Sequence, residues 1–148
     1  MSYITRTLVP YKFVFITLQS LFLVAILNNK SDNIFISIRA NATKDSTEYS
    51  DEEGSLDAAA ALMLATCGLE FFNLLVGLTI FNDKLNIVEI FCHFFACILC
   101  AWFIIDLWDV QSLWIIFGVF VAPFLFLEVL ITVQPLASRL MAMRKTNQ

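Results

Sequence analysis

A single acidic side chain, Glu70, lies near the middle of a stretch from Ala58 to Phe81 that contains no other charged residue. The stretch is long enough to cross a bilayer as a helix. At the centre of a bilayer an acidic residue costs about 2.5 to 3.5 kcal/mol on insertion scales, so it is expected to have a partner or a function. Carboxyl groups at this depth are typical of proton relays and ion paths.

Other polar side chains fall on helix faces that can meet Glu70. Asn73 and Gly77 follow Glu70 by three and seven residues and share its helix face. Glu89 and His93, four residues apart, share a face of the next apolar segment. We therefore predict an interior polar seam, completed by one residue each from the first and last apolar segments. Its members are Gln19, Glu70, Asn73, Glu89, His93 and Glu128.

Pro123 precedes Glu128 and lacks a backbone N–H, so it is predicted to bend the last apolar segment and to free carbonyl groups there. Two interpretations of the seam remain open. It can carry protons through Glu70, His93 and Glu128, or it can join helices by hydrogen bonds worth about 0.6 kcal/mol each. We favour the second interpretation. A transporter of this size must dimerise to enclose a path, and the sequence shows neither paired broken helices nor an internal repeat.

The four cysteines, Cys67, Cys92, Cys97 and Cys100, all fall within apolar segments. Cys97-x-x-Cys100 resembles half of a redox or zinc motif, but one histidine and intramembrane thiols do not supply the ligands of a zinc site. We expect inert buried thiols, no metal and no cofactor. Because the chain also lacks a catalytic constellation, we expect a non-enzymatic protein that takes no small-molecule substrate and binds no nucleic acid.

Composition and hydropathy place all of these residues in a membrane protein. Of the 148 residues 59% are hydrophobic and 15% are charged, whereas a soluble domain is about 25% charged. Four apolar segments each reach the roughly 20 residues that a spanning helix needs. They predict an all-α integral membrane protein, a four-helix transmembrane bundle that forms a single domain over residues 1–148. The predicted spans are 8–27, 58–81, 85–105 and 113–133, with one long loop at 28–57.

Local signals predict how these spans begin and pack. The first span is expected to be a retained signal anchor, because no small-x-small cleavage site follows it. Pro10 falls in its predicted first turn, where the missing N–H costs least. The short connections after the second and third spans predict that spans two to four are antiparallel neighbours. Small residues in the second span are predicted to pack against another helix: Ala58, Ala61, Ala65 and Gly68.

Lysine and arginine counts predict that both termini are cytoplasmic, because cytoplasmic flanks carry the excess of these residues. Six fall on the side of the termini and three on the side of the long loop. The six are Arg6, Lys12, Lys84, Arg139, Arg144 and Lys145. The loop is then lumenal or extracellular, where its two sequons, at Asn29 and Asn41, can be glycosylated. Asn41 is the better site, because Asn29 lies almost at the membrane surface.

The two halves of the long loop differ in character. Residues 44–57 are acidic and nearly free of aromatic side chains, so we expect a solvated connector. A binding segment for a basic partner is the alternative. Residues 34–38 have isoleucine at every second position and resemble a short strand.

Residues spread along the whole chain resemble the transmembrane protein 107 family. The similarity begins at Leu8-Val9-Pro10 and is strongest from Glu70 to Glu128. Its further positions are Gly77, Phe81-Asn82, His93, Trp108, Trp114-x-x-Phe117 and Pro123. The chain departs from the family pattern at Asp106, which is followed by Leu107 where an acidic-basic pair is expected.

The resemblance implies a small four-span protein in the membrane of the ciliary transition zone, at the base of the cilium. It implies a non-enzymatic scaffold that recruits or anchors other membrane and soluble proteins of the Meckel syndrome module. Such a scaffold is expected to support cilium assembly and to limit diffusion between the ciliary and plasma membranes. A small proton-linked transporter or channel subunit that uses the intramembrane Glu and His residues remains the alternative.

Overall fold

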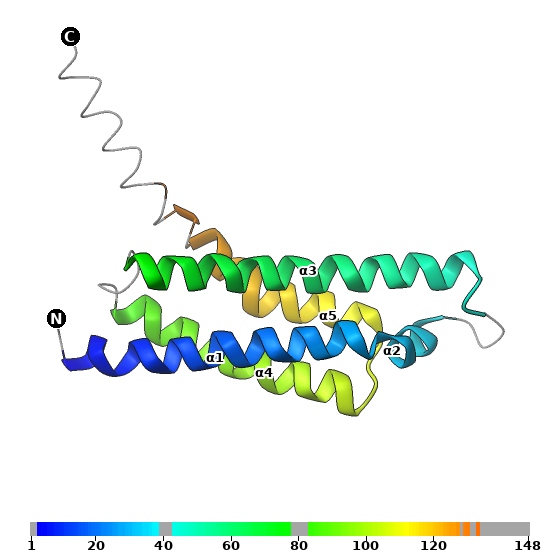
Figure 1. The fold of residues 1–148 in the computed structure, drawn as a ribbon, viewed down its shortest axis with the longest axis horizontal. Coiled ribbons are helices and arrows are strands. Elements are labelled where there is room, and N and C mark those ends of the chain that lie inside the picture. The colour runs from blue at the N-terminus through cyan, green and yellow to red at the C-terminus, as the bar shows by residue number, and fades with distance from the viewer. Residues whose placement is uncertain (1–2, 39–42, 78–82, 128, 131–132, 134–148) are drawn as a thin grey trace, which may run out of the picture.

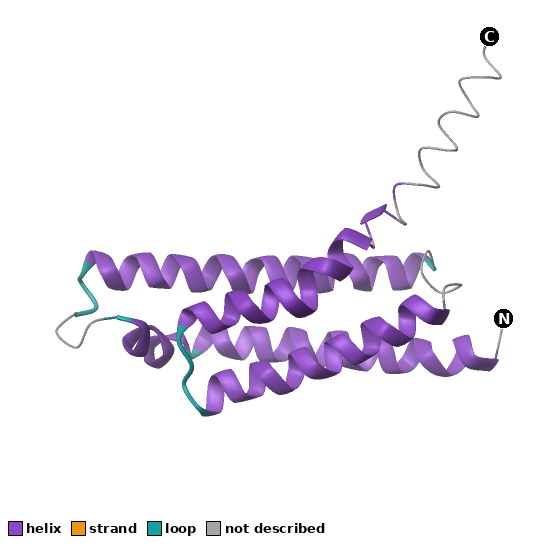
Figure 2. Cartoon of the chain, turned by 180° about the vertical axis from the view of Figure 1, so that it is seen from behind, coloured by secondary structure: helices purple, strands orange, loops and turns teal. Residues whose placement is uncertain are grey.

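The computed structural model describes residues 3–38, 43–77, 83–127, 129–130 and 133. These residues are almost entirely helical, and none of them lies in a strand (Figure 2), which confirms the all-α prediction. Four helical stretches within the described ranges are long and apolar enough to cross a membrane: Thr7–Asn28, Thr47–Val76, Lys84–Ile105 and Val110–Leu127. The protein is therefore an integral, multi-pass membrane protein.

The long helices alternate in direction along the bundle (Figure 1). α1 (Tyr3–Asn28) and α4 (Asp83–Ile105) run one way. α3 (Thr47–Val76) and α5 (Val110–Ile116) run the other way, and α5 continues into a π-helical turn, η1 (Phe117–Val121). The start of α1 and the end of α3 thus lie at one end of the bundle, which we call the N-terminal end (Figure 1). The turn between α4 and α5 lies at the other.

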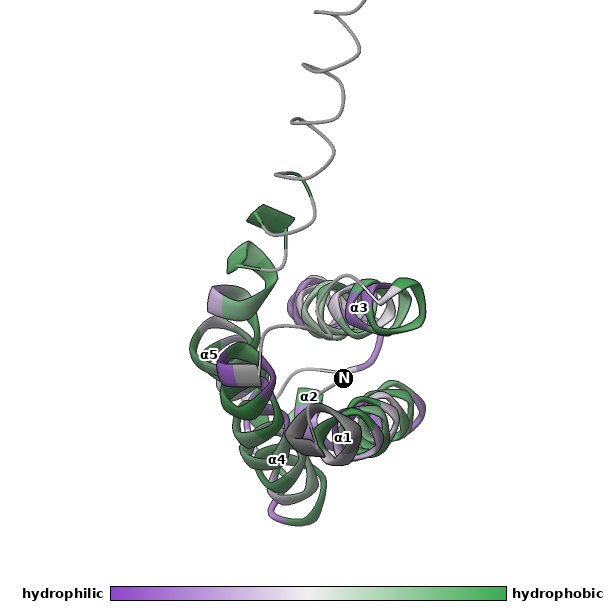
Figure 3. Cartoon of the chain, turned by 90° about the vertical axis from the view of Figure 1, so that its left-hand side faces the viewer, coloured by the Kyte–Doolittle hydropathy of each residue, from purple (hydrophilic) through white to green (hydrophobic). Residues whose placement is uncertain are grey.

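The order of the helices around the bundle differs from the prediction. α1 packs against both α4 and α3, and α5 packs against both α3 and α4. Seen along the bundle, the order is α1, α4, α5, α3 (Figure 3). α3 and α4 therefore lie at opposite corners, and the prediction that the second and third spans are neighbours is wrong. The short connection between α3 and α4 is compatible with adjacent or with diagonal placement of the two helices. The inward face of α1 lies between them.

Each long helix buries residues at alternating three- and four-residue spacings, the pattern of an interior helical stripe. On α1 these are Lys12, Ile16, Gln19, Leu23 and Ile26. The buried polar residues of the long helices lie in the half of the bundle near the N-terminal end, while the cores of these helices in the other half are apolar. This apolar half includes Leu23, Ile26, Leu56, Ala59, Ala60, Met63, Ala96, Cys100, Phe103 and Leu113.

A short helix, α2 (Lys30–Ser37), covers the end of the bundle where α4 turns into α5 (Figure 1). The Asn33 amide donates hydrogen bonds to the carbonyl oxygens of Phe103, at 2.9 Å, and Trp108, at 2.8 Å. The Ser37 hydroxyl oxygen accepts one from the backbone N–H of Val110 at 2.8 Å. These bonds tie α2 to backbone groups at the end of α4 and the start of α5, where the carbonyl oxygen of Phe103 also accepts from the N–H of Trp108 at 3.3 Å. We call this end of the bundle the α2 end.

Lys30 ties α2 to α3. Its Nζ lies 2.8 Å from an oxygen of Glu53 and 2.7 Å from one of Asp57. Burial lowers the pKa of Lys30, but the hydrogen bonds and the attraction of Asp57 and Glu53 outweigh it, so the pKa lies above its ordinary value of 10.5. As long as Asp57 and Glu53 are ionised, the contribution of the pair to stability is therefore complete below pH 10.5 and is lost as the pH rises through the raised pKa of Lys30. Because the groups are partly exposed, that contribution is about 1 kcal/mol or less.

The long loop is more ordered than predicted. α3 begins at Thr47, with Ser46 as its N-cap, whose side-chain oxygen accepts from the N–H of Tyr49 at 3.2 Å. Tyr49 and Leu56 are buried, so the acidic segment 44–57 is largely a helix that contributes to the core, and the prediction of a solvated connector is wrong. The prediction of a strand-like segment at 34–38 is also wrong, because these residues fall in α2 and at its C-cap and the side chain of Ile34 is fully buried.

Three further details depart from the predictions. α3 ends at Val76, because Gly77 takes the left-handed conformation, φ 80°, that commonly ends a helix. α1 begins at Tyr3, so Pro10 lies inside the helix rather than in its first turn. The small residues of the second span face outward, because the core-facing positions of α3 are the alternate ones. The outward residues are Ala58, Ala61, Ala65 and Gly68.

The contacts of α2 yield a first test. Replacement Asn33→Ala removes two hydrogen bonds: the carbonyl oxygen of Trp108 loses this partner, and that of Phe103 keeps the N–H of Trp108. We therefore expect a loss of about 1 to 3 kcal/mol in unfolding free energy. Thermal unfolding of the purified protein in one detergent measures it. Asn28→Ala is the control, because the Asn28 side chain is exposed and donates only within its own helix, to Val24. Equal unfolding midpoints for the two variants would contradict this role of Asn33.

Candidate functional site

Five side chains from three helices form what we call the polar cluster. Lys12 and Gln19 come from α1, Glu70 from α3, and Glu89 and His93 from α4. None of the five is more than 6% exposed. Two cationic or ionisable nitrogen groups and two carboxyl groups are thus enclosed where neither water nor lipid headgroups reach them. Each must find its partners within the protein.

His93 connects the corners of the bundle. Its Nδ1 lies 2.6 Å from the side-chain carbonyl oxygen of Gln19, and its Nε2 contacts a carboxyl oxygen of Glu70. A carbonyl oxygen can only accept, so Nδ1 carries a proton. The other ring nitrogen and Glu70 then share one proton, as imidazolium and carboxylate or as imidazole and carboxylic acid. The pair is neutral overall in both forms, which suits a site inside a membrane.

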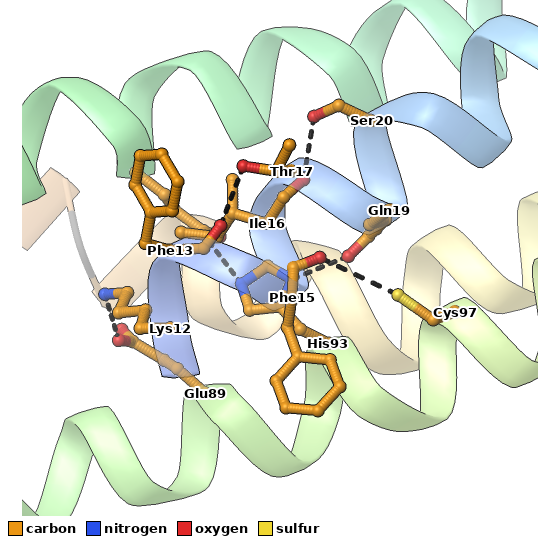
Figure 4. Close-up of polar contacts among 11 residues, drawn as sticks. Lys12, Phe13, Phe15, Ile16, Thr17, Gln19, Ser20, Glu89, His93 and Cys97 are labelled. Atoms are coloured by element: carbon orange, nitrogen blue, oxygen red, sulfur yellow. Dashed lines mark hydrogen bonds and ion pairs between the residues drawn. The ribbon is translucent and has the colours of Figure 1, made fainter. Parts of the chain in front are cut away.

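Lys12 and Glu89 form the second pair of the cluster, with Nζ 2.5 Å from a carboxyl oxygen (Figure 4). Lys12 is not among the predicted seam residues and was counted with the cytoplasmic flanking residues. The structure places it inside the span and 1% exposed, so that count becomes five against three. One signal was available: Lys12 and Gln19 are seven residues apart on one face of α1, matching the face of α4 that carries Glu89 and His93.

The remaining members of the predicted seam have different positions. Asn73 is fully buried, one turn after Glu70 on the inward face of α3. Glu128 lies outside the described residues. Pro123 is exposed and lies two residues after the π-helical turn η1, whose C-cap Ala122 donates its backbone N–H to the carbonyl oxygen of Phe117, five residues earlier. The helix is thus irregular where the proline was predicted to disturb it.

The two sequons also differ. Asn29 is exposed between α1 and α2, and its side chain donates to the carbonyl oxygen of Ala25 at 3.2 Å. Asn41 lies outside the described residues.

Towards the α2 end, the polar cluster borders a layer of buried apolar side chains. Leu23 follows Gln19 on α1, Met63 precedes Glu70 on α3, and Ala96 follows His93 on α4. Over the described ranges, no three His, Cys, Asp or Glu side chains are placed to hold a metal ion. Because His93 contacts Glu70, the cluster can pass a proton between these two side chains. Its polar groups do not extend to the α2 end of the bundle.

The Lys12–Glu89 pair yields a second test. The variant Lys12→Met leaves Glu89 in the core without its cation, so we expect a loss of about 3 to 5 kcal/mol in unfolding free energy. The double variant Lys12→Met/Glu89→Met replaces both charges by apolar chains of similar length. It should recover most of that loss, because no charge then remains unpaired. Denaturation of the purified protein in mixed micelles measures both. A double variant as unstable as the single one would contradict a direct pairing.

Comparison with known proteins assigns the family. The TMEM107 transmembrane protein family model matches residues 8–132. The chain is 27% identical to transmembrane protein 107 of Danio rerio over 114 residues, which cover 77% of this chain and 83% of the relative. For the protein of the same name from Homo sapiens, identity is 24% over 110 residues, which cover 74% and 77%. No solved structure matches the chain. The chain therefore belongs to the transmembrane protein 107 family.

Proposed function

We propose that this protein is a non-enzymatic scaffold in the membrane of the ciliary transition zone. In this role it recruits or anchors proteins of the Meckel syndrome module, supports cilium assembly, and helps to limit diffusion between the ciliary and plasma membranes. The observation that carries the proposal is that the buried polar side chains contact one another across the bundle. The contacts His93–Glu70, His93–Gln19 and Lys12–Glu89 join α1, α3 and α4, which suits a fixed body that presents its outer faces to partners.

A proton-linked transporter or channel subunit is the second candidate, favoured by the contact between Glu70 and His93 in the bundle interior. A carrier needs polar groups or water from one side of the membrane to the other. In the described ranges the polar cluster ends against Leu23, Met63 and Ala96. We therefore rank transport below the scaffold.

The proposed orientation places the N-terminal end of the bundle in the cytoplasm and the α2 end in the lumen or outside the cell. The excess of Lys and Arg on the side of the termini, five against three without Lys12, supports it. Module partners then meet the lipid-facing helix faces within the membrane and the exposed ends of the helices on either side.

One substitution separates the two candidate functions. Glu70→Gln keeps the size and hydrogen bonding of the side chain but cannot release a proton at physiological pH. We expect the tagged variant, expressed at native level in a ciliated cell, to form the same band between basal body and axoneme as the original protein. Glu70→Leu, which cannot bond to His93, should weaken that band. Loss of the band with Glu70→Gln alone, or a diffuse signal of the unchanged protein, would contradict the scaffold proposal.

The orientation has its own test. If residues 28–57 enter the lumen, the Asn41→Gln variant should lose the mass of one N-linked glycan on electrophoresis, as the original protein does after enzymatic deglycosylation. Asn29→Gln is the matched control, because the oligosaccharide-transferring enzyme reaches a site at the membrane surface poorly. Absence of any glycan on the original protein would remove this support for the lumenal placement.

A further inference from the structure

The outer surface of the bundle is hollowed by a groove of about 410 Å³ between α1 and α3. Its floor is made by Ile16 and Cys67, both almost fully buried, and by Gly68. A Cβ atom added at Gly68 would meet nothing within 4 Å. The space above this glycine is therefore open, and the groove reaches down to the core layer of the bundle.

The lining of the groove suits an apolar occupant. Its two hydroxyl groups belong to Thr17 and Ser20 on the side of α1 towards α3 (Figure 4). Both donate within their own helix, Thr17 to the carbonyl oxygen of Phe13 at 2.8 Å and Ser20 to that of Ile16 at 2.9 Å. Neither hydroxyl hydrogen is left for a ligand. Apart from the thiol of Cys67, the remaining lining side chains are apolar, so the groove offers a polar ligand little beyond two hydroxyl oxygens as acceptors.

The groove is continuous with the lipid-facing surface of the protein. Its residues lie within the spans Thr7–Asn28 and Thr47–Val76. Next to them, large apolar side chains are exposed on the same two helices, among them Leu18 and Leu21 on α1 and Phe72 on α3. Membrane hydrocarbon therefore meets the groove directly.

The shape of the groove favours a flexible chain over a helix. The rings of Phe13 and Phe71 lie 5.1 Å apart, centroid to centroid, and close the groove from α1 to α3 at the end nearer the N-terminal end. A straight helix lying along α1 and α3 would collide with this aromatic pair. A flexible hydrocarbon chain can approach from the other end, where Ser20 is about 12 Å, eight helical residues, from the end of the span at Asn28.

We propose that this groove binds one acyl chain of a phospholipid in the leaflet at the α2 end. The headgroup stays at the membrane surface near α2, and the chain runs between α1 and α3 to the space over Gly68. This inference stands apart from the proposed scaffold function, since it concerns only the lipid that the bundle carries.

The test uses a phosphatidylcholine with a photoactivatable diazirine midway along one acyl chain, incorporated into nanodiscs that hold the full-length protein. Cross-linked peptides are mapped by mass spectrometry after illumination. Gly68→Leu fills the open space, and we expect several-fold less cross-linking on residues 13–20 and 64–71. Gly118→Leu is the matched control. Gly118 is also exposed within a span, a Cβ there would also meet nothing within 4 Å, and it lies outside the groove.

The map of the unchanged protein decides the matter even if Gly68→Leu fails to fold. Cross-links concentrated on the two groove segments would support the proposal, and even labelling around the lipid-facing surface would overturn it. Labelling of the groove that is unaffected by Gly68→Leu in a folded variant would also overturn it. So would preferential labelling by a photoactivatable sterol, or a dimer in nanodiscs that Gly68→Leu separates, because a sterol or a second copy would then be the occupant.

Discussion

Hydrocarbon does not solvate charged or strongly polar side chains, and the arrangement of this bundle follows from that constraint. Lys12, Glu70, Glu89 and His93 are all enclosed in the membrane-spanning part. Each contacts an acidic or basic partner on another helix: Lys12 contacts Glu89, and His93 contacts Glu70. His93 on α4 reaches Glu70 on α3 across the diagonal of the bundle, with Gln19 of α1 on its other ring nitrogen. The polar contacts thus fix α1 between α3 and α4, and the apolar residues pack around that arrangement.

The same constraint shapes the α2 end by a different route. Backbone groups at helix ends need partners, and close to a membrane water supplies them only in part. The side chains of Asn33 and Ser37 on α2 bond to backbone groups at the turn from α4 to α5. A segment that looks like a plain connector in the sequence is therefore part of the fold. It closes the apolar half of the bundle on the side opposite to the polar cluster.

The sequence was sufficient to predict the class of protein and the four spans, and most of the span ends were predicted to within a few residues. It was also sufficient to predict Glu70, Glu89, His93 and Gln19 as interior residues. Helical periodicity identifies the inward face of a helix but not the helix that it meets, so the diagonal placement of α3 and α4 was missed. Lys12 was missed because counting charges assumes that lysines near a helix start face water. The first turns of α3 were missed because their acidic residues conceal the buried positions Tyr49 and Leu56.

The central claim is that the polar cluster joins three helices through His93, and it can be measured directly. His93 is the only histidine of the chain, so ¹⁵N-labelled histidine reports on this site alone in a protein that also carries ¹³C at its Glu carboxyl groups. Solid-state NMR of the protein in lipid bilayers then measures the dipolar coupling between the ring nitrogens and the carboxyl carbons. A strong coupling from Nε2 to one carboxyl carbon, lost with Glu70→Gln labelled in the same way, is the expected result. A histidine ring without such a coupling would contradict the account.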